Sequence, residues 1–500
     1  MKIVSLDQDY HDSLDELGKP LGAERAGDIL SPEFSEDRLA LRFAERHGSD
    51  LRYVAAWGKW LAWTGTHWEL ENTLAVFDTS RKICREAAAE CNKASVANAI
   101  AKAKTVAAIE MLARSDRRIA ATIDQWDADS YVLTTTASLV DLKNGRSRPH
   151  RREAYATKIT ATEPGSACPK FLEFLQTIFA DDQELIDYIQ KVFGYALTGD
   201  TREHALFFFH GTGANGKSVL VSTIAGILGD YHKTAPIETF VATAIASHPT
   251  DLAGLRGARL VTAVETEEGR RWAESKIKSL TGGDRISARF MRQDFFEFVP
   301  TFKLIIAGNH KPGLRSVDEA IRRRFHLVPF TVTIPPEERD KDLTEKLKTE
   351  WPGILQWAIE GCLKWQAEGL EKPIAVAEAT AAYLEAEDAI TAWIDERCER
   401  KATWWEPASA LFASWKAWAE LNGEFVGSQK QFSEKLEGRS ITPVRKGKNR
   451  TRGYQREDTK EFSLSKPSLY RKLAIGNRKA DASGRVFCID RHVCARARDG

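Results

Sequence analysis

The alternation of polar and apolar residues divides the N-terminal part of the chain into short predicted elements. In chain order, these are a flexible polar leader at residues 1–35, a helix around Leu39–Ala44, a β-hairpin over Tyr53–Trp68 that turns at Thr64–Gly65, helices over 75–122, strands over Tyr131–Leu142 followed by a turn at Asn144–Gly145, and helices over 169–197. The pattern therefore predicts a mainly helical segment with a few strands.

A different pattern follows, in which a short apolar run precedes a glycine-rich segment. Leu206–Phe209 is long enough for one buried strand. After the glycine-rich segment, apolar residues recur every four positions from Leu220 to Leu228, and Gly229 stands where a helix commonly ends. The glycine-rich segment is thus expected to join a buried strand to a helix.

The glycine-rich segment has the composition of a phosphate-binding loop. It reads Gly211, Thr212, Gly213, Ala214, Asn215, Gly216, Lys217 and Ser218, a complete G-x-x-x-x-G-K-[ST] pattern. Glycines let backbone N–H groups approach phosphates, and the helix that follows favours an anion at its start. Lys217 is expected to reach the β- and γ-phosphates of ATP, and Ser218 to ligate Mg²⁺. The alternative, an ordinary glycine-rich turn, is disfavoured by the flanking strand and helix.

A second predicted strand, Arg259–Val264, runs into carboxylates. This arrangement is typical of nucleotide hydrolases, in which one acid holds Mg²⁺ and another polarises the attacking water. We favour Glu265 on the metal side and Glu267 on the water, although the two roles could be exchanged. An acidic turn without function is the alternative interpretation.

Polar residues also end or interrupt the elements that follow. Arg289 and Arg292 lie in a predicted hairpin with a basic tip, and Asn309 follows a third apolar strand, where it could bond the γ-phosphate or the water. Three consecutive arginines then precede a fourth strand, and arginine can stabilise phosphoryl transfer from a neighbouring subunit. Of these we favour Arg323, then Arg324; a solvated basic face is the alternative.

A tryptophan cluster and a pair of aspartates each have both a functional and a structural interpretation. The tryptophans between Trp57 and Trp68 could stack on bases, but aromatic clusters mostly pack, so we favour an aromatic mini-core. The pair Asp127 and Asp129 could bind a metal ion in a primase or polymerase. No apolar strand precedes it and no companion carboxylate is evident, so we favour a structural role.

The motif series resembles that of superfamily 3 helicases, and more closely the phage and plasmid primase–helicase family with its poxvirus relatives. The resemblance extends from about residue 36 to about residue 455 and rests on these segments: Gly211–Ser218, Glu265–Gly269, Leu280–Asp284, Ala307–Asn309, Arg323–Arg324 with Pro329–Phe330, and, before them, Trp126–Asp129, Val140–Leu142, Arg148–His150 and Gly194–Asp200.

The resemblance implies an α/β fold with an AAA+ P-loop core and a parallel sheet, preceded by a mainly helical α+β domain. It also implies ATP and Mg²⁺, a hexameric ring, 3′-to-5′ translocation on DNA, and a central channel lined by the hairpin of Arg289–Asp294. Many members begin with a primase domain, for which there is no length before residue 36, so we expect no primase activity from this chain. A separate primase is a possible partner.

The C-terminal third predicts a small DNA-binding domain. A helix over Ser409–Trp418, a turn at Gly423 and a helix over Ser428–Leu436 precede a basic hairpin over Ile441–Tyr454. This order indicates a winged helix, with DNA contacts from the hairpin's basic residues, Arg445, Lys446 and Lys448. A solvated basic face is the alternative. The tail from about Thr459 resembles nothing in the family and is expected to be disordered.

The expected domain limits are a leader at 1–35, a helical domain at 36–190, an ATPase domain at 191–370, a winged-helix-like domain at 371–458 and a basic tail at 459–500.

Composition adds a charge asymmetry. The net charge is only +1, but about 21 basic and about 11 acidic residues follow from Lys401 onward, which favours a nucleic-acid partner there. The seven cysteines form no C-x-x-C pair, so no zinc site is expected and a reducing compartment fits. The N-terminus lacks an export signal and no apolar run approaches membrane-spanning length. With the phage resemblance, the expected location is the cytosol of a bacterial host.

These observations favour an ATP-driven DNA helicase that acts in the replication of a mobile element. The first alternative is an AAA+ ATPase that remodels a protein complex, which the basic residues Arg289 and Arg292 disfavour. The second is an origin-binding protein in which bound nucleotide only sets the shape, which the carboxylates Glu265 and Glu267 disfavour.

Overall fold

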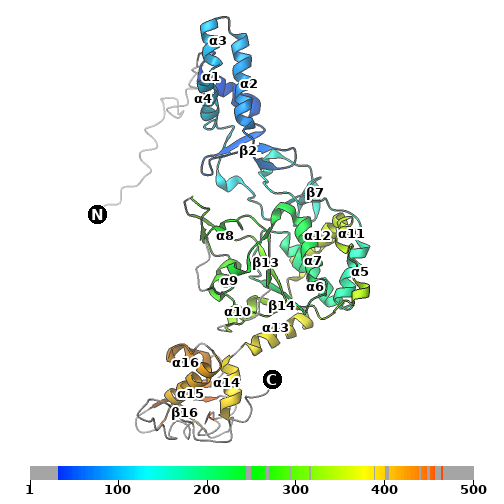
Figure 1. Cartoon of the computed structure of the whole chain (residues 1–500), viewed down its shortest axis with the longest axis vertical. Helices are drawn as coiled ribbons and strands as arrows, with labels where there is room; N and C mark the ends of the chain where they lie inside the picture. Colours follow the sequence, from blue (N-terminus) through cyan, green and yellow to red (C-terminus); the bar gives the residue numbers. More distant parts are fainter. Residues whose placement is uncertain are drawn as a thin grey trace, which may run out of the picture. The chain divides into compact units, whose positions relative to one another are not determined.

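The computed structural model describes residues 32–243, 249–265, 270–292, 294–314, 317–387, 389–399, 405–424, 426–437, 441–446, 451–456 and 463–464. Contacts group the chain into two compact units (Figure 1). The first comprises 1–268, 275–311 and 323–377, and the second comprises 269–274, 312–322 and 378–500. Within the described residues, no helix combines the length and apolar character needed to cross a membrane.

The first unit begins with a group of helices, drawn in blue in Figure 1. They are α1 (Glu36–His47), α2 (Ala75–Glu90), α3 (Ala94–Ile100) and α4 (Ala103–Ala113). Helix α1 starts where the hydroxyl of Ser35 accepts a hydrogen bond from the backbone N–H of Arg38 at 3.1 Å, an N-cap. Phe43 of α1 packs in one core with Ile83 of α2 and Ile109 of α4. The predicted helices are therefore confirmed up to α4.

The prediction that the helical segment continues to residue 122 is wrong. Ala120–Ala121 forms strand β4, which pairs in parallel with Tyr53 and Val54 of β1. Alanine favours helix locally, but its small side chain also suits a strand when a partner strand offers free backbone groups. The pairing was invisible in the local sequence because the partner lies far away in the chain.

This part of the chain also contains two small sheets, and the strands β1 to β3 of the first lie between α1 and α2 in the sequence. The first has the order β3-β2-β1-β4, with β1 (Leu51–Val54), β2 (Lys59–Trp63) and β3 (Trp68–Leu70) antiparallel. The second joins β5 (Val132–Thr134), β6 (Leu139–Asp141) and β7 (Arg146–Arg148). The predicted turns at Thr64–Gly65 and Asn144–Gly145 are confirmed, and a turn at Ala55–Gly58 was not predicted.

The tryptophan cluster packs as an aromatic core, as favoured above. Trp68 is fully buried, and its ring meets that of Trp126 edge-on with centroids 5.8 Å apart. Trp63 approaches Trp68 at 5.6 Å in the same way. Edge-to-face contacts of this kind stabilise a core, and they leave Trp68 no free face for a base.

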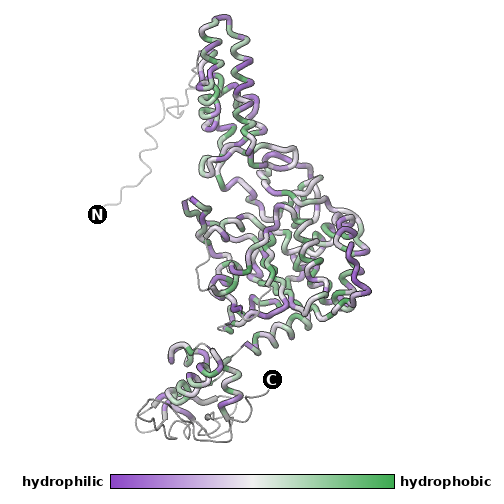
Figure 2. Tube along the Cα trace, in the orientation of Figure 1, coloured by the Kyte–Doolittle hydropathy of each residue, from purple (hydrophilic) through white to green (hydrophobic). Residues whose placement is uncertain are grey.

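A parallel five-stranded sheet forms the centre of the first unit. Its strands are β8 (Leu206–His210), β9 (His232–Thr234), β10 (Leu260–Glu265), β13 (Lys303–Gly308) and β14 (Phe325–Pro329), in the order β14-β8-β13-β10-β9. The prediction of an α/β fold with a parallel sheet is confirmed. Apart from the edge strand β9, which reads His-Lys-Thr, the strands are mainly apolar (Figure 2), because side chains on both faces of these strands are buried.

Helices cover the sheet on both sides (Figure 1). Phe207 and Phe209 of β8 share one core cluster with residues of α5 (Pro169–Ile178), α6 (Gln183–Ala196), α7 (Lys217–Leu228) and α12 (Trp351–Glu368). In the view of Figure 1, α8 (Pro249–Ala253) and α9 (Glu274–Thr281) lie across β13 from these helices. The first unit also contains α11 (Leu343–Lys348), β11 (Ile286–Ala288) and β12 (Phe296–Phe298). Helix α10 (Glu319–Arg324) belongs to the second unit up to Arg322 and to the first unit from Arg323.

Helices α6 and α12 approach each other very closely. A Cβ added at Gly194 would lie 2.1 Å from the backbone nitrogen of Cys362, and one added at Gly361 would lie 2.1 Å from the carbonyl oxygen of Gln190. Both glycines are therefore required by the distance between the two backbones.

The second unit contains the small domain predicted in the C-terminal third. Its elements include α13 (Ile374–Ala386), α14 (Ala389–Arg397), β15 (Cys398–Glu399), β16 (Glu406–Pro407), α15 (Ala408–Leu421), α16 (Gln429–Glu437), β17 (Ile441–Lys446), β18 (Thr451–Arg456) and β19 (Ser463–Leu464). Strands β17 and β18 form the predicted hairpin, with β16 added beside β18. Trp393, Trp415 and Phe432 form the centre of its core.

The tail from Thr459 departs from the expectation of disorder at one point. Strand β19 pairs antiparallel with β15, so Ser463–Leu464 has regular structure. A segment of two residues is too short to show a hydrophobic periodicity in the sequence. Only its pairing with β15 makes it a strand. The other tail residues lie outside the described ones.

Candidate nucleotide site and basic hairpins

The predicted phosphate loop connects β8 to α7, the context that its chemistry requires. Gly213 and Gly216 have φ of +105° and +79°, which other residues adopt only with strain. A Cβ at Gly216 would also lie 2.5 Å from Ile178 Cγ2, and one at Gly211 would lie 2.4 Å from the carbonyl oxygen of Phe330. Glycine at these two positions thus lets the loop lie close to Ile178 and Phe330, because any larger side chain would collide with them.

Lys217 is the buried cation of this loop, with only 5% of its surface exposed. Its Nζ donates hydrogen bonds to three oxygens: Gly211 O at 2.7 Å, Asn215 Oδ1 at 3.1 Å and Asn309 Oδ1 at 3.1 Å. Burial lowers the pKa of this ammonium because it has lost part of its water shell. A cation in this position gains from an anion that replaces the missing water, as a phosphate would.

The strand order places the other candidate residues beside Lys217. Strand β13 lies between β8 and β10, and Gly308 is level with His210 on one side and Glu265 on the other. Asn309, which follows Gly308, therefore stands between the loop and the end of β10. Ligands bind at this carboxyl edge in open α/β sheets.

Not every predicted residue of this site can be placed. Ser218 is exposed at the start of α7, and Glu265 ends β10 as predicted. The side chain of Glu265 and the whole of Glu267 lie outside the described residues, so their roles stay predictions.

His210 is a residue of this edge that the sequence reasoning missed. Burial, followed by the charges of Lys311 and Lys217, lowers its pKa to about 4. The imidazole is therefore neutral at physiological pH and adds no charge beside the phosphate loop. Its position directly before Gly211 was the signal that could have identified it.

The consecutive arginines of α10 have different surroundings. Arg323 is exposed, whereas Arg324 is 7% exposed and donates from Nε to Thr281 Oγ1 at 3.2 Å. An arginine that acts on a neighbouring subunit must reach outward. The exposure of Arg323 fits that requirement better than the burial of Arg324.

The predicted basic hairpin is confirmed by the antiparallel pairing of β11 with β12. Arg289 lies over the ring of Phe295 at 4.7 Å, a cation–π contact. Arg292 is exposed at the tip with φ of +60°, a turn conformation. Phe290 and Met291 are 40% and 71% exposed, so the tip presents apolar as well as basic groups.

The carboxylates of Asp127 and Asp129 bond backbone N–H groups, which fits the structural role that the sequence favours. Asp127 accepts a hydrogen bond from the backbone N–H of Thr157 at 2.8 Å, and Asp129 accepts one from that of Tyr131 at 2.9 Å. Across the part of the chain that the structure describes, no cluster of three or more His, Cys, Asp or Glu residues could hold a metal ion.

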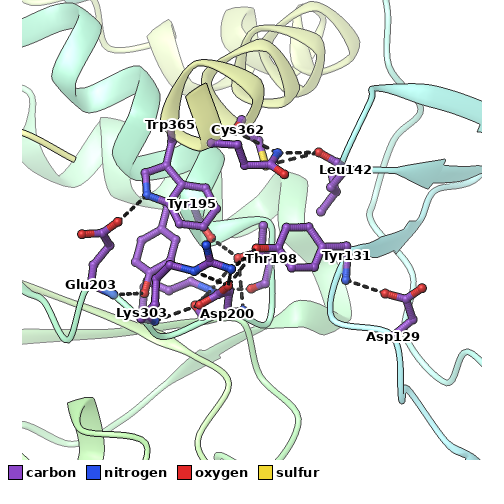
Figure 3. Close-up of polar contacts among 12 residues, drawn as sticks. Asp129, Tyr131, Leu142, Tyr195, Thr198, Asp200, Glu203, Lys303, Cys362 and Trp365 are labelled. Carbon is purple, nitrogen blue, oxygen red and sulfur yellow. Dashed lines mark hydrogen bonds and ion pairs between the residues drawn. The ribbon is translucent and has the colours of Figure 1, made fainter. Parts of the chain in front are cut away.

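A buried polar network lies at the amino-terminal end of β13, opposite the phosphate loop (Figure 3). Lys303 Nζ donates to the carbonyl oxygens of Thr198 and, at 3.1 Å, of Asp200, and it lies 4.7 Å from the centre of the Tyr195 ring. Burial, followed by the nearby charge of Arg259, holds the pKa of Lys303 well below its usual value. Carbonyls of the segment that follows α6 thus anchor the start of β13.

The basic hairpin of the second unit is only partly described. Arg445 is exposed and lies level with Arg452 on the neighbouring strand. Lys446 ends β17 but its side chain is not described, and Lys448 lies outside the described residues. Of the three predicted DNA contacts in this hairpin, only the side chain of Arg445 is thus placed.

Two family models match the chain. Residues 40–180 match the family described as "D5 N terminal like", and residues 209–324 match a family of unknown function, DUF5906. The second match contains the phosphate loop, Asn309 and the three arginines.

Viral proteins are similar in sequence. "Putative helicase L207/L206" of Acanthamoeba polyphaga mimivirus is 27% identical over 40% of this chain and 23% of its own length. "Putative helicase 022R" of Frog virus 3 (isolate Goorha) is 25% identical over 51% of this chain and 28% of its own length. The matched segments thus span about a quarter of these relatives.

Among solved structures, the apo C-terminal region of NrS-1 is 10% identical, with a TM-score of 0.47, and the match covers 84% of this chain and 99% of that one. The family models and the viral relatives support the phage and viral primase–helicase family that the motifs of this chain resemble.

Proposed function

We propose that the chain is an ATP-dependent DNA helicase of a phage or plasmid-like mobile element, built on an AAA+ P-loop core and expected in the cytosol of a bacterial host. One observation carries the proposal. The buried Lys217 bonds Asn309 at the carboxyl edge of the sheet, on the strand next to the one that Glu265 ends. A loop with this lysine, an adjacent amide and a neighbouring carboxylate provides the groups that phosphoryl transfer to water requires.

Each residue of the nucleotide site has a separate role in the proposed hydrolysis of ATP. The loop Gly211–Ser218 binds the phosphates through backbone N–H groups, and Lys217 neutralises the β- and γ-phosphates. The Ser218 hydroxyl and Glu265 would hold Mg²⁺, which neutralises charge on the phosphates when bound. Glu267 orients and polarises the attacking water, and Asn309 donates from its amide to the γ-phosphate or the water.

The ATPase site is proposed to be shared between subunits of a ring, for which a hexamer is expected. Arg323 is the favoured finger and Arg324 the second choice, because Arg323 is exposed whereas Arg324 is bonded to Thr281. Such an arginine is worth about 10³–10⁵ in turnover because it stabilises charge that forms only in the transition state.

Mixing two inactive variants tests the shared site. Lys217→Ala subunits cannot use ATP but still offer the finger, and Arg323→Ala subunits bind ATP but offer none. Mixed rings should regain part of the ATPase activity, because some interfaces combine an intact loop with an intact finger. If subunits exchange and activity stays at the level of the separate variants, the finger does not act between subunits.

DNA is proposed to contact both basic hairpins. Arg289 and Arg292 would bind phosphates in the channel of the ring, and the winged-helix-like domain would bind through Arg445, Lys446 and Lys448. Aromatic and basic groups at one hairpin tip favour DNA over the protein substrate of a remodelling ATPase. A separate primase is a candidate partner.

ATP hydrolysis with and without single-stranded DNA decides between the proposals. The helicase requires turnover that DNA stimulates, and unwinding of a forked duplex. Lys217→Ala should abolish turnover, whereas Glu267→Gln should retain ATP binding and lose hydrolysis. Turnover without a response to DNA would favour the remodelling ATPase, and nucleotide binding without turnover would favour the origin-binding protein.

A further inference from the structure

A cavity of about 390 Å³ between α8, α9 and β11 has no lining residue in common with the phosphate loop. Its apolar lining comes from Leu252, Leu280 and Ile286. Leu280 and Ile286 are buried, at 1% and 8% exposure, so the cavity reaches the apolar interior. The volume lies in the range of small-molecule sites, which are mostly apolar with a few polar groups.

The polar lining of the cavity is basic and rich in hydroxyls. It includes Lys276 and Arg285 as well as Ser279 and Ser287. Burial lowers the pKa of the half-buried Lys276, and Asp251 is the acid that acts against this shift. A cation that has lost part of its water is stabilised by an anionic ligand. The lining thus combines an apolar base with cations and hydrogen-bond donors.

The polar lining continues along β11 toward the hairpin tip. Arg285, Ser287 and Arg289 are exposed, whereas Ile286 and Ala288 between them are buried. Successive side chains of a strand point to opposite faces, so the exposed residues form one row. The four residue steps from Arg285 to Arg289 span about 13 Å in an extended chain. This distance corresponds to about four nucleotides at the 3.4 Å rise of a stacked strand.

We propose that this cavity holds one nucleotide of a single strand of nucleic acid, with the phosphate on Lys276 and Arg285 and the base against Leu280 and Ile286. The strand then continues along the exposed row of β11 to Arg289. The ligand is a single strand because a base can enter a cavity only when it is unpaired. The inference rests on the proposed function for the identity of the partner, and it adds residues that no other observation assigns to DNA.

Salt dependence tests the phosphate contacts. The affinity of the full chain for a labelled oligothymidylate is measured over a series of salt concentrations for Lys276→Ala and Arg285→Ala. Each variant should bind more weakly, and the slope of log K against log salt should become shallower by about 0.7, the value for one lost contact on a single strand. Lys278→Ala is the matched control, because it removes the same charge from the same helix outside the cavity lining.

Filling the cavity tests the place of the base. Ser279→Leu adds apolar volume to the cavity, leaves every charge in place and suits a helix. This substitution should weaken binding, but the slope of log K against log salt should remain that of the unchanged protein. Thermal unfolding of each variant shows that the fold is retained. Unchanged binding by Ser279→Leu, or unchanged slopes for both cationic variants, would overturn the proposal.

A competition experiment distinguishes a nucleotide that is part of a strand from a free nucleotide. Deoxythymidine monophosphate should compete with the oligonucleotide only weakly, because it lacks the contacts along β11. Competition at equal concentration would show a site for free nucleotides and overturn the assignment to a strand. If the unchanged protein bound no oligothymidylate, the proposed helicase function would fail as well, whereas normal binding with unaffected variants overturns the cavity assignment alone.

Discussion

Substitution of Asn309 separates two roles that this side chain can have. Its Oδ1 accepts a hydrogen bond from Lys217 Nζ at 3.1 Å, and its amide nitrogen is available to a phosphate or water. The side chain is exposed, so substitution should change the free energy of unfolding by no more than about 0.5 kcal/mol. Changes in turnover can then be assigned to chemistry.

Two variants divide the roles. Asn309→Ala removes both the acceptor and the donor. Asn309→Asp keeps an acceptor for Lys217 but replaces the donor with a charged oxygen. Two like charges about 4 Å apart near a protein surface repel by about 4 kcal/mol. The aspartate should therefore oppose the γ-phosphate. The loss of a donor aimed at developing charge costs about 10²–10³ in kcat.

Steady-state hydrolysis at saturating ATP gives kcat, and a fluorescent ATP analogue gives the affinity. We expect kcat to fall by about 10²–10³ for Asn309→Ala. Asn309→Asp should lose at least as much and bind ATP more weakly. If Asn309→Asp retained full kcat, the residue would serve only to hold Lys217. If both variants kept kcat within about 3-fold, well below the loss expected for a donor, Asn309 would have no part in the reaction.

Three further predictions test packing, charge and DNA contact. Helix propensity predicts that Gly194→Ala stabilises the protein by about 1 kcal/mol. Its Cβ would lie 2.1 Å from Cys362 N, so we instead expect a loss of about 1–3 kcal/mol in urea unfolding. Burial alone would raise the pKa of the Asp200 carboxyl, but hydrogen bonds from Arg202 and Tyr131, together with the charge of Arg202, lower it. The ionised carboxylate therefore stabilises the fold at neutral pH, and this stabilisation is lost as the pH falls through the folded-state pKa. Tyr131→Phe should therefore unfold more easily near pH 7, with a smaller difference from the unchanged protein in acid, and a difference that did not change with pH would contradict this reasoning. Arg445→Ala should make the salt slope for duplex binding shallower by about 0.9, and an unchanged slope would remove Arg445 from the DNA contacts.

Several features follow from short stretches of sequence. The phosphate loop needs only its own residue types and the apolar segments on either side, so its place between β8 and α7 was predictable. The helix–turn–helix and hairpin of the second unit were also predictable, because Gly423 and the apolar spacing act locally. The family could be recognised for the same reason, since its motifs are short and separate.

The tertiary structure decided how distant residues meet. Strand β13 inserts between β8 and β10, and this order brings Asn309 to Lys217 although 92 positions separate them. The consecutive residues Arg323 and Arg324 differ in exposure, because Arg324 is buried where it bonds Thr281 whereas Arg323 is exposed.

The same reason explains the wrong predictions. Ala120–Ala121 and Ser463–Leu464 became strands only because a partner strand from another part of the chain supplied their backbone hydrogen bonds. The cavity beside β11 likewise combines residues from two helices and a strand. Local propensities depend on neighbours in the sequence, whereas strand pairing, burial and cavities depend on neighbours in space, which are set only when the whole chain has folded.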